Sequence, residues 1–346
     1  MKILVRGTNW IGDSVMSIPA LRSLRARFPE AEIVLLTRAV NEGLFQDGNL
    51  VDRVMPIETS GSGVAQTISL TRRLRKERFD VGIVLPNSFS SALPLKLAGI
   101  PRRFGYATDR RRVLLTDAVP VPNWKALRHE VFYYMCLAAA VEERLPGEGP
   151  GGQVDSYPRI EISNDRLDAA REFLAQHSLD LTRPVVAIGA GSTNSNAKRW
   201  PVERFVETGE RLQKTLGAQI VLLGSDGDRE VSEQIVSGLS ERPLDLTGKT
   251  SIAEVAAILS EVDLLIANDM GLAHVAPAVG TRTLVLFGPT DPTTTRPLSQ
   301  LAEVVRHEVE CSPCMLRECP VDHRCMTRIG VDNVCNIATR MLKLND

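Results

Sequence analysis

The stretch ANDMGLAHVAPAVGTRTLVLFGP, residues 267–289, decides the fold. An apolar run at residues 264–266 ends at Asp269, a turn with Gly271 follows, then a helix-like segment carrying His274, then a second apolar run. This order predicts a strand–turn–helix–strand unit with polar groups at one end. The free N–H groups where such a helix begins suit a phosphate or a diphosphate. An ordinary βαβ crossover with polar caps would show the same residues, so both interpretations stay open here.

Length and composition predict a protein of two domains without a membrane anchor. The 346 residues exceed one ordinary core, and 43% hydrophobic with 24% charged residues is typical of soluble globular proteins. No apolar run approaches the roughly 20 residues that cross a bilayer. The N-terminus, MKILVRGTNWIGD, lacks the long apolar stretch and cleavage site of a signal peptide. We therefore expect a cytoplasmic protein.

Apolar strands alternate with amphipathic helices in both halves of the chain. Strands are expected at residues 2–5, 32–37, 53–57, 81–85, 184–189, 219–223, 264–267 and 283–287. Helices are expected at about residues 13–28, 64–76, 89–98, 201–216, 228–239 and 252–260. This alternation is typical of α/β proteins, in which a parallel sheet is covered by helices on both faces.

The two halves predict two doubly wound, Rossmann-like domains, at residues 1–160 and 161–330, facing each other across a cleft. A C-terminal helix at 331–346 is expected to pack back on the first domain. Ligands of such sheets bind beyond the carboxyl ends of the strands. Both halves carry their Gly-rich, polar loops at those ends, so the cleft is the expected binding site.

Charge is distributed unevenly along the chain. The net charge is -1, but residues 1–160 carry +6 and residues 161–346 carry -7. Basic clusters lie at 72–78, where a solvated helix face explains them, and at 102–112, in a stretch that reads as irregular and turn-rich. A basic first domain favours an anionic partner. Aromatic residues make up only 5%, without a nucleic-acid-binding motif, so nucleic acid is not an expected partner.

Asp13 is the first candidate for chemistry, because it directly follows the first expected strand. A carboxylate there can accept the proton of a hydroxyl nucleophile. It can equally cap the next helix, a role that Asp fills well. Gly7 and Gly12 are five apart and do not form the dinucleotide fingerprint GxGxxG. The nucleophile elbow GxSxG of hydrolases is absent from the sequence.

Lys198 is the second candidate, behind a loop of small polar residues that includes Ser192 and Thr193. Backbone and hydroxyl donors of such a loop can approach a phosphate, and lysine adds a point charge. A solvated lysine is the alternative. The loop does not match GxxxxGK[ST], so ATP hydrolysis has no support.

Acidic residues follow the expected strand at 219–223. Asp228 or Glu230 can bind a ribose hydroxyl, as acids at this point of such folds do. Helix N-terminal acids stabilised by the dipole are an equally good explanation. Asp226, Gly227 and Asp228 also match the metal-binding pattern Asp-x-Asp, although their position at a helix start makes a metal role weak.

Five of the six cysteines lie in residues 311–335. Cys311 and Cys314 form a C-x2-C pair, the common half of a zinc site, and Cys319 with Cys325 would complete the ligands of zinc or of an iron–sulfur cluster. The remaining spacings fit no standard zinc finger. A reduced cap with buried thiols, or cysteines that pair on oxidation, are the alternatives.

Short motifs recur in order through nearly the whole chain. They are WIGD at 10–13, LPNSF at 85–89, AGIP at 98–101, AKRWP at 197–201, LTG at 246–248, ND-x-GL-x-H at 268–274 and GPT at 288–290. Their order and spacing resemble the ADP-heptose:lipopolysaccharide heptosyltransferase family. The resemblance implies a GT-B fold and an inverting transfer of L-glycero-D-manno-heptose from ADP-heptose to a heptose on Kdo–lipid A. It also implies no cofactor and a peripheral contact with the inner membrane surface.

The resemblance also implies roles for single residues. Asp13 would be the general base, Lys198 would neutralise the departing diphosphate, and Asp269 would contact the donor sugar. The other implied donor contacts are Ser192, Thr193, Asp228 or Glu230, Met270, Gly271, Leu272 and His274. The implied acceptor contacts are Asn87, Ser88, Arg110 and Arg111.

One departure from the family pattern concerns the donor site. Met270 stands where the family usually has Ser or Thr, which removes a hydroxyl donor but keeps the backbone N–H. Another GT-B sugar transferase, a nucleotide-sugar epimerase and a nucleotide-sugar-binding protein without turnover stay open as alternatives.

Overall fold

The computed structural model describes residues 1–57, 63–150, 154–193 and 195–343. The chain divides into two compact units, Met1–Ile160 and Glu161–Asp346. Residues 344–346 of the expected C-terminal helix lie outside the described part, as do residues 58–62, 151–153 and 194.

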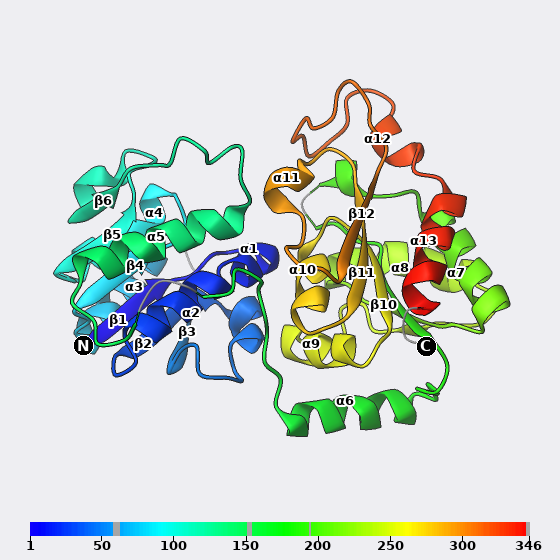
Figure 1. The fold of residues 1–346 in the computed structure, drawn as a ribbon, viewed down its shortest axis with the longest axis horizontal. Coiled ribbons are helices and arrows are strands. Elements are labelled where there is room, and N and C mark those ends of the chain that lie inside the picture. The colour runs from blue at the N-terminus through cyan, green and yellow to red at the C-terminus, as the bar shows by residue number, and fades with distance from the viewer. Residues whose placement is uncertain (58–62, 151–153, 194, 344–346) are drawn as a thin grey trace. The chain divides into compact units, whose positions relative to one another are not determined.

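The first unit is built on a parallel sheet with the strand order β3-β2-β1-β4-β5-β6 (Figure 1). Its strands are β1 (Lys2–Arg6), β2 (Glu32–Arg38), β3 (Arg53–Ile57), β4 (Val81–Val84), β5 (Arg102–Tyr106) and β6 (Asp117–Val119). Its helices are α1 (Ile11–Met16), α2 (Ile18–Arg27), α3 (Gly63–Glu77), α4 (Phe89–Leu97) and α5 (Glu130–Arg144).

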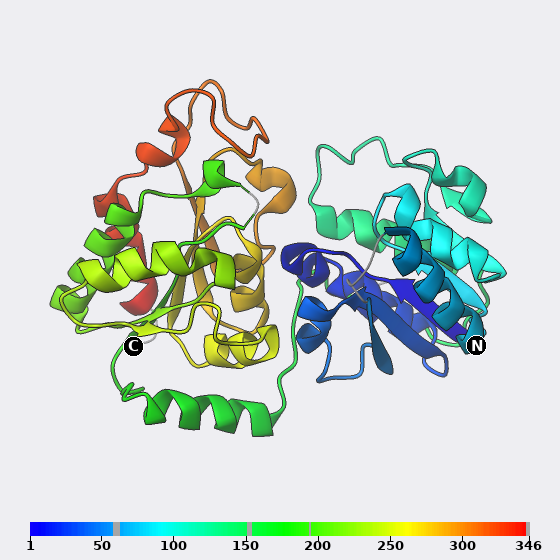
Figure 2. The ribbon, with the colours of Figure 1, turned by 180° about the vertical axis from the view of Figure 1, so that it is seen from behind.

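Helices cover both faces of this sheet, which explains why its central strands are apolar throughout. Helices α2 and α5 pack together on the face turned to the viewer in Figure 1, and α3 and α4 on the face seen in Figure 2. Leu74 of α3 and Leu95 of α4 share one buried cluster with Leu4 and Val34 of the sheet. A strand buried on both sides must be apolar at successive positions rather than at alternate ones.

The single helix expected at residues 13–28 is two helices in the structure. Helix α1 ends at Met16, and α2 begins after Ser17. The prediction was wrong because Pro19, at the start of α2, has no N–H to donate and its ring crowds the preceding turn. The apolar spacing continues across this break, so periodicity alone did not reveal it.

The basic stretch at 102–112, expected to be irregular, begins with strand β5. Phe104 and Tyr106 are fully buried, while Arg102 forms two bonds of 2.9 Å with Asp117 of the neighbouring edge strand. Arg102 lies on the same face of the strand as Phe104 and Tyr106, and Arg103, on the other face, donates to the Leu114 carbonyl at 2.7 Å. The two adjacent arginines at the start of the strand hid it in the sequence.

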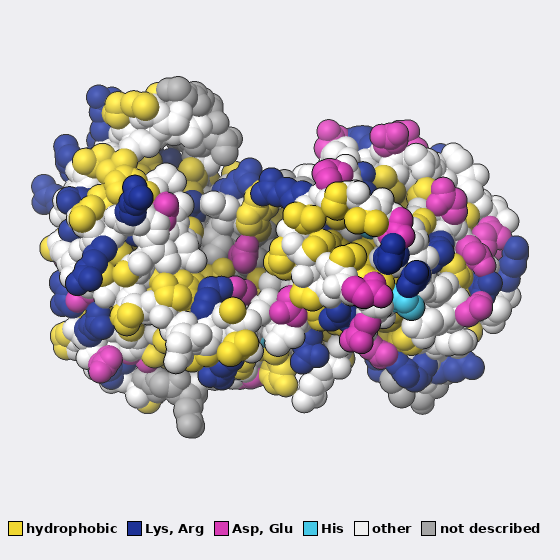
Figure 3. All heavy atoms as spheres, turned by 90° about the horizontal axis from the view of Figure 1, so that it is seen from above, with side chains coloured by type: hydrophobic (Ala, Val, Ile, Leu, Met, Phe, Trp, Pro, Cys, Tyr) yellow, Lys and Arg dark blue, Asp and Glu magenta, His cyan; other side chains and the backbone are white. Residues whose placement is uncertain are grey.

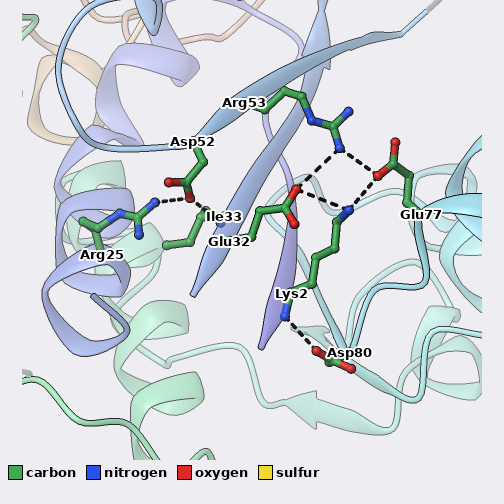
Figure 4. A network of polar contacts seen from close by, with 8 residues as sticks. All are labelled: Lys2, Arg25, Glu32, Ile33, Asp52, Arg53, Glu77 and Asp80. Atoms are coloured by element: carbon green, nitrogen blue, oxygen red, sulfur yellow. Dashed lines mark hydrogen bonds and ion pairs between the residues drawn. The ribbon is translucent and has the colours of Figure 1, made fainter. Parts of the chain in front are cut away.

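A network of charges lies where the strands of the first sheet begin (Figure 4). Lys2 Nζ lies 2.7 Å from Glu77 and 3.2 Å from Glu32, and Arg53 lies 2.7 Å from Glu77. Hydrogen bonds from Lys2 and Arg53 hold the pKa of the Glu77 carboxyl below its usual range. The network therefore belongs to the structural edge of the sheet, opposite the carboxyl ends where ligands bind.

The second unit repeats the plan with the strand order β12-β11-β10-β7-β8-β9. Its strands are β7 (Val185–Gly189), β8 (Gln219–Leu222), β9 (Leu244–Asp245), β10 (Leu264–Asn268), β11 (Arg282–Phe287) and β12 (Ala302–Arg306). Its helices are α6 (Asn164–Gln176), α7 (Val202–Leu216), α8 (Arg229–Gly238), α9 (Ile252–Ser260), α10 (Gly271–Ala278), α11 (Pro292–Thr295), α12 (Arg324–Thr327) and α13 (Val331–Lys343).

The C-terminal helix α13 belongs to the second unit, which corrects the expectation that it packs on the first. It lies against α7, β10 and β11. Val334, Ala338 and Met341 are buried in the same apolar cluster as Phe205 and Leu212 of α7. Burying this apolar stripe within its own unit is the physical reason, because a helix with one apolar face packs where that face is covered. Across the described residues, every helix falls short of the length and apolar character needed to cross a membrane.

Candidate active site

The strand order reverses at one point in each sheet, between β1 and β4 in the first unit and between β7 and β10 in the second. Doubly wound sheets bind ligands outside the carboxyl ends of the strands at such a point. Asp13 follows β1, and Asn87 and Ser88 follow β4. Lys198 follows β7, and Asp269 follows β10. The folding topology thus gathers the sequence-predicted residues at the two switch points, one set in each unit.

Lys198 and Asp269 form the central contact of the second unit. Lys198 Nζ lies 2.7 Å from Asp269 Oδ2 and donates to the Asp269 backbone carbonyl at 3.3 Å. Thr290, which follows β11, donates to the same carboxylate oxygen at 2.7 Å. The Asp269 side chain is 6% exposed and that of Lys198 is 26% exposed. A buried carboxylate therefore fixes a lysine whose amino group reaches the open end of the sheet.

Asn268 ties the loops of the two central strands together. It is fully buried; its Oδ1 accepts from the Trp200 N–H at 3.0 Å, and its Nδ2 donates to the Ala190 carbonyl at 2.6 Å. Buried polar groups of this kind are stabilising only when paired, and here both ends of the amide are paired. The Asn-Asp pair at the end of β10 thus sets the distance between the lysine loop and its carboxylate.

Thr290 was missed as a site residue by the sequence reasoning, although its motif was noticed. Gly288, Pro289 and Thr290 were used only as carriers of the family resemblance. A hydroxyl directly after a strand that neighbours the switch point was the available signal. This signal was overlooked because the pairing of β11 with β10 depends on the tertiary structure and is not visible in the sequence.

The structure separates the two acids that were alternatives for the ribose. Asp228 is 1% exposed, and its Oδ2 accepts from the Ser225 N–H at 3.0 Å and the Ser225 hydroxyl at 2.6 Å. It packs so closely on Gly191 that a Cβ there would lie 2.1 Å from the Asp228 carboxyl carbon. Glu230 is exposed in the first turn of α8. Asp228 thus joins two loops, whereas the Glu230 side chain is open to solvent.

The small-residue loop and the start of α10 face the same end of the sheet. The Thr193 hydroxyl lies 3.4 Å from the Ser225 hydroxyl, and Ser192 is buried. Met270 caps α10 in an extended conformation and makes no side-chain cap bond, since a thioether is a weak acceptor. The first N–H groups of α10, at Gly271 and Leu272, have no carbonyl within the helix to bond.

Two of the predicted donor contacts, His274 and Met270, are buried and half-buried in the second unit. His274 is 6% exposed within α10. The Met270 side chain turns back over Gly189 of β7. A Cβ added to Gly189 would lie 3.1 Å from the Met270 sulfur. The hydroxyl that the family usually has here is replaced by an apolar contact with the sheet.

Asp13 lies in the first turn of α1 in the first unit. Trp10 occupies the N-cap position, so the structure does not support the alternative that Asp13 caps the helix. The Tyr134 hydroxyl of α5 donates to Asp13 Oδ1 at 3.2 Å. Burial, followed by the Asp13 charge, raises the pKa of Tyr134 well above its usual value. The phenol stays protonated and acts as a hydrogen-bond donor to a half-buried carboxylate.

The four predicted acceptor contacts differ in exposure: three are exposed and one is buried. Asn87, Ser88 and Arg110 are exposed, and the Asn87 amide oxygen accepts from the Tyr133 hydroxyl at 3.1 Å. Arg111 is fully buried, with Nε donating to the Tyr106 carbonyl at 2.8 Å, and burial lowers its pKa to about 10. We therefore assign Arg111 no acceptor contact: its guanidinium holds backbone carbonyls together inside the unit.

Comparison with known proteins decides the family. The model of glycosyltransferase family 9 (heptosyltransferase) matches residues 67–324. The chain belongs to glycosyltransferase family 9. It is 33% identical over 317 residues to lipopolysaccharide heptosyltransferase 2 of Escherichia coli (strain K12), with 88% of each chain covered. It is 30% identical over 312 residues to lipooligosaccharide heptosyltransferase 2 of Haemophilus influenzae, again with 88% of each covered.

Solved structures of family 9 confirm the GT-B fold of two Rossmann-like units. The structure of E. coli ADP-heptose lps heptosyltransferase II matches with a TM-score of 0.83 at 30% identity, covering 100% of this chain and 99% of the other. A family 9 protein from Veillonella parvula matches with a TM-score of 0.85 at 22% identity, covering 100% and 98%. The second match supports the fold alone.

The cysteines of this family 9 chain are free thiols in the structure, with Cys325 buried and Cys311 and Cys314 exposed. Within the described residues, no three His, Cys, Asp or Glu side chains form a group that could hold an ion. The metal site at Cys311, Cys314, Cys319 and Cys325 and the reduced cap both stay predictions from the sequence.

Proposed function

We propose that this glycosyltransferase transfers L-glycero-D-manno-heptose from ADP-heptose to a heptose of the Kdo–lipid A inner core. The observation that carries the proposal is the pair of Lys198 and Asp269, 2.7 Å apart at the switch point of the second unit. A fixed cation beside free N–H groups of a helix start is suited to a diphosphate. The names of the relatives at 30% identity and above supply the sugar and the acceptor class.

In this proposal the second unit binds the donor. The Lys198 ammonium and the N–H groups of Gly271 and Leu272 hold the diphosphate and stabilise the negative charge that ADP gains as the bond to the sugar breaks. Thr193 adds a hydroxyl donor to the phosphates. Glu230, exposed where β8 ends, accepts from the ribose hydroxyls.

The first unit provides the base in this proposal. Asp13 accepts the proton of the acceptor hydroxyl while the oxygen attacks the anomeric carbon and ADP departs, in a single displacement that inverts the anomeric centre. The Tyr134 hydroxyl orients the carboxylate by its bond to Oδ1. Asn87, Ser88 and Arg110, exposed after β4 and β5, contact the acceptor.

A basic surface on the first unit suits an anionic acceptor at a membrane surface. Residues 1–160 carry a net charge of +6, and Figure 3 shows Lys and Arg side chains spread over this unit among exposed hydrophobic ones. Val113 and Leu127 are 69% and 74% exposed, and Arg112 and Arg128 beside them in the sequence are exposed too. We expect sedimentation with phosphatidylglycerol vesicles but not with phosphatidylcholine vesicles. Equal sedimentation with both would contradict an electrostatic membrane contact.

The test of the proposed function is ADP release from ADP-heptose with a defined heptosyl-Kdo–lipid A acceptor. Asp13→Asn should abolish transfer and leave ADP binding within twofold of wild type. Lys198→Ala should weaken ADP binding in titration calorimetry by about tenfold, the effect of one charge-assisted contact of about 1.5 kcal/mol or more. Transfer that survives Asp13→Asn would remove Asp13 as the base.

A further inference from the structure

The segment of residues 307–323, here named the cysteine loop, connects β12 to α12 without any helix or strand. Met315, Leu316 and Val321 are 59%, 46% and 64% exposed, so the loop buries little apolar surface of its own. A loop of this length without regular structure is uncommon and is usually functional. The contacts that hold it in place therefore indicate its role.

One side of the cysteine loop is bonded to the backbone that leads into Lys198. The Arg317 carbonyl accepts from the Ala197 N–H at 3.0 Å and from the Ser195 hydroxyl at 3.1 Å. The His323 Nε2 lies 2.6 Å from the Ala197 carbonyl. Since a carbonyl only accepts, the His323 ring donates through Nε2. Both peptide groups of Ala197, the residue before Lys198, are thus held by this loop.

The other side of the cysteine loop is bonded to the backbone that leads into Thr290. The Pro289 carbonyl accepts from the N–H groups of Cys314 at 2.9 Å and Met315 at 2.8 Å. The Ser312 hydroxyl donates to the Gly288 carbonyl at 2.5 Å. Lys198 and Thr290 bond the same oxygen of Asp269, so one loop anchors both residues that bond this carboxylate.

His323 itself is held in an uncommon conformation. Its φ is 58°, in the left-handed region that residues with a Cβ rarely adopt. Its N–H lies 3.3 Å from the Cys319 sulfur. Surroundings that maintain such a conformation fix the direction of the ring, here toward the carbonyl next to Lys198.

The thiols stiffen the base of the loop by packing rather than by reactivity. Cys325 is buried, and a Cβ on Gly288 would lie 3.2 Å from its sulfur. Burial raises the pKa of the Cys325 thiol, and Cys319, Cys311 and Cys314 raise it further. A buried neutral thiol is an inert, polarisable packing group.

We propose that the cysteine loop is a positioning element of the donor site and that His323 positions Lys198 through the Ala197 peptide. This inference rests on the proposed function, because it takes Lys198 as the residue that binds the diphosphate. His323 is a positioning residue: its ring bonds the backbone beside Lys198 and is assigned no contact with a substrate.

The test is ADP binding by titration calorimetry on the full chain, arranged as a double-mutant cycle. His323→Ala should weaken ADP binding about threefold to tenfold, the effect of one lost hydrogen bond. In the Lys198→Ala background the same change should weaken binding less than twofold, because residues that act through one another are not additive. His323→Gln, which keeps an N–H donor, should restore at least half of the lost affinity.

The matched control is His177→Ala in the same unit. His177 is exposed at the end of α6, and its ring lies 2.8 Å from the Phe173 carbonyl, so it also pairs with a backbone oxygen. This variant should bind ADP as wild type does. Equal weakening by His323→Ala in both backgrounds, or no weakening in a folded protein, would overturn the inference.

A second variant keeps the test decisive if His323→Ala does not fold. Ser312→Ala removes the bond to the Gly288 carbonyl on the other side of the loop and should weaken ADP binding about twofold to fivefold. Unchanged affinity in that variant would count against the positioning role. Wild-type affinity in Lys198→Ala would instead overturn the proposed donor site itself, so the two failures are distinct.

Discussion

The hydrogen bond from Tyr134 to Asp13 gives the sharpest prediction about catalysis. Tyr134→Phe removes one oxygen from a residue that is 7% exposed and leaves the ring that packs in α5. The Asp13 carboxylate loses the donor that lies 3.2 Å from Oδ1. A donor stabilises the charged form of a carboxylate, so its loss makes protonation easier. The acid limb of the transfer rate should therefore move to higher pH.

The size of the shift follows from the geometry. Hydrogen bonds to charged groups contribute about 1.5–3 kcal/mol, and the shortest O–H···O⁻ bonds measure about 2.5–2.7 Å. The bond to Asp13 is longer, at 3.2 Å, so we take about 1 kcal/mol as its contribution. At about 1.36 kcal/mol per pH unit, the limb should move up by roughly 0.7 unit. At pH values below the midpoint of the acid limb, the rate of Tyr134→Phe should be about fivefold lower than that of wild type.

The assay is the pH profile of kcat/KM for ADP release at a fixed acceptor concentration. Tyr106→Phe is the matched control: its hydroxyl donates to the Tyr133 carbonyl at 2.7 Å, in the same unit but away from Asp13. The control variant should lose stability without moving the limb. An unmoved limb in Tyr134→Phe, or an equal movement in both variants, would refute the role given to this phenol.

Three further predictions test the architecture around the site. Thr290→Val removes one of the two donors on the carboxylate shared with the donor-site lysine, and it should raise KM for ADP-heptose about threefold in steady-state assays. Gly191→Ala should lower stability by about 1–3 kcal/mol in urea unfolding, since the new Cβ would meet the Asp228 carboxyl carbon at 2.1 Å, whereas a Cβ on Gly227 would come no closer than 3.9 Å, to the Ser225 hydroxyl oxygen, so Gly227→Ala should cost less than half of that. Glu77→Gln should cost a few tenths to about 1 kcal/mol at pH 7, and this cost should shrink as the pH falls, because a lowered pKa stabilises the fold above the unfolded value and this contribution is lost as pH falls through the folded value; a pH-independent cost would contradict the ion-pair assignment.

Much of the fold was predictable because its signals are local. Continuous apolar runs such as those of β1 and β10 are typical of strands buried on both faces, and the helices between them have the period of 3.6 residues. The failures arose where tertiary context outweighs local pattern. Arg102 and Arg103 made β5 hard to recognise in the sequence. Their backbone is part of the strand, while their charged groups extend away from it. The surface on which α13 packs depends on which other apolar face is available to cover it, and the sequence of the helix alone does not specify that face.

The site was predictable to the extent that it follows strand ends. Asp13, Lys198 and Asp269 were predicted because each follows an apolar run, and the structure places each beyond the carboxyl end of a strand. Tyr134 was not found, since it lies 121 residues from Asp13 on a helix whose apolar face explains it without any function. Arg110 and Arg111 could not be separated by sequence. Adjacent arginines look alike until the turn between them sends one side chain outward and the other into the core.

The two aspartates at the switch points differ in their partners, and this difference bears on the roles proposed for them. Asp269 holds a lysine and a threonine hydroxyl on one oxygen, so taking up a proton there would break the ion pair that fixes Lys198. Asp13 accepts from the neutral Tyr134 phenol and is half-buried. A diphosphate site needs a cation that stays in place, and a general base needs a carboxylate that can take up a proton. The ion pair on Asp269 therefore supports the charge-stabilising role proposed for Lys198, and Asp13 remains the proposed base.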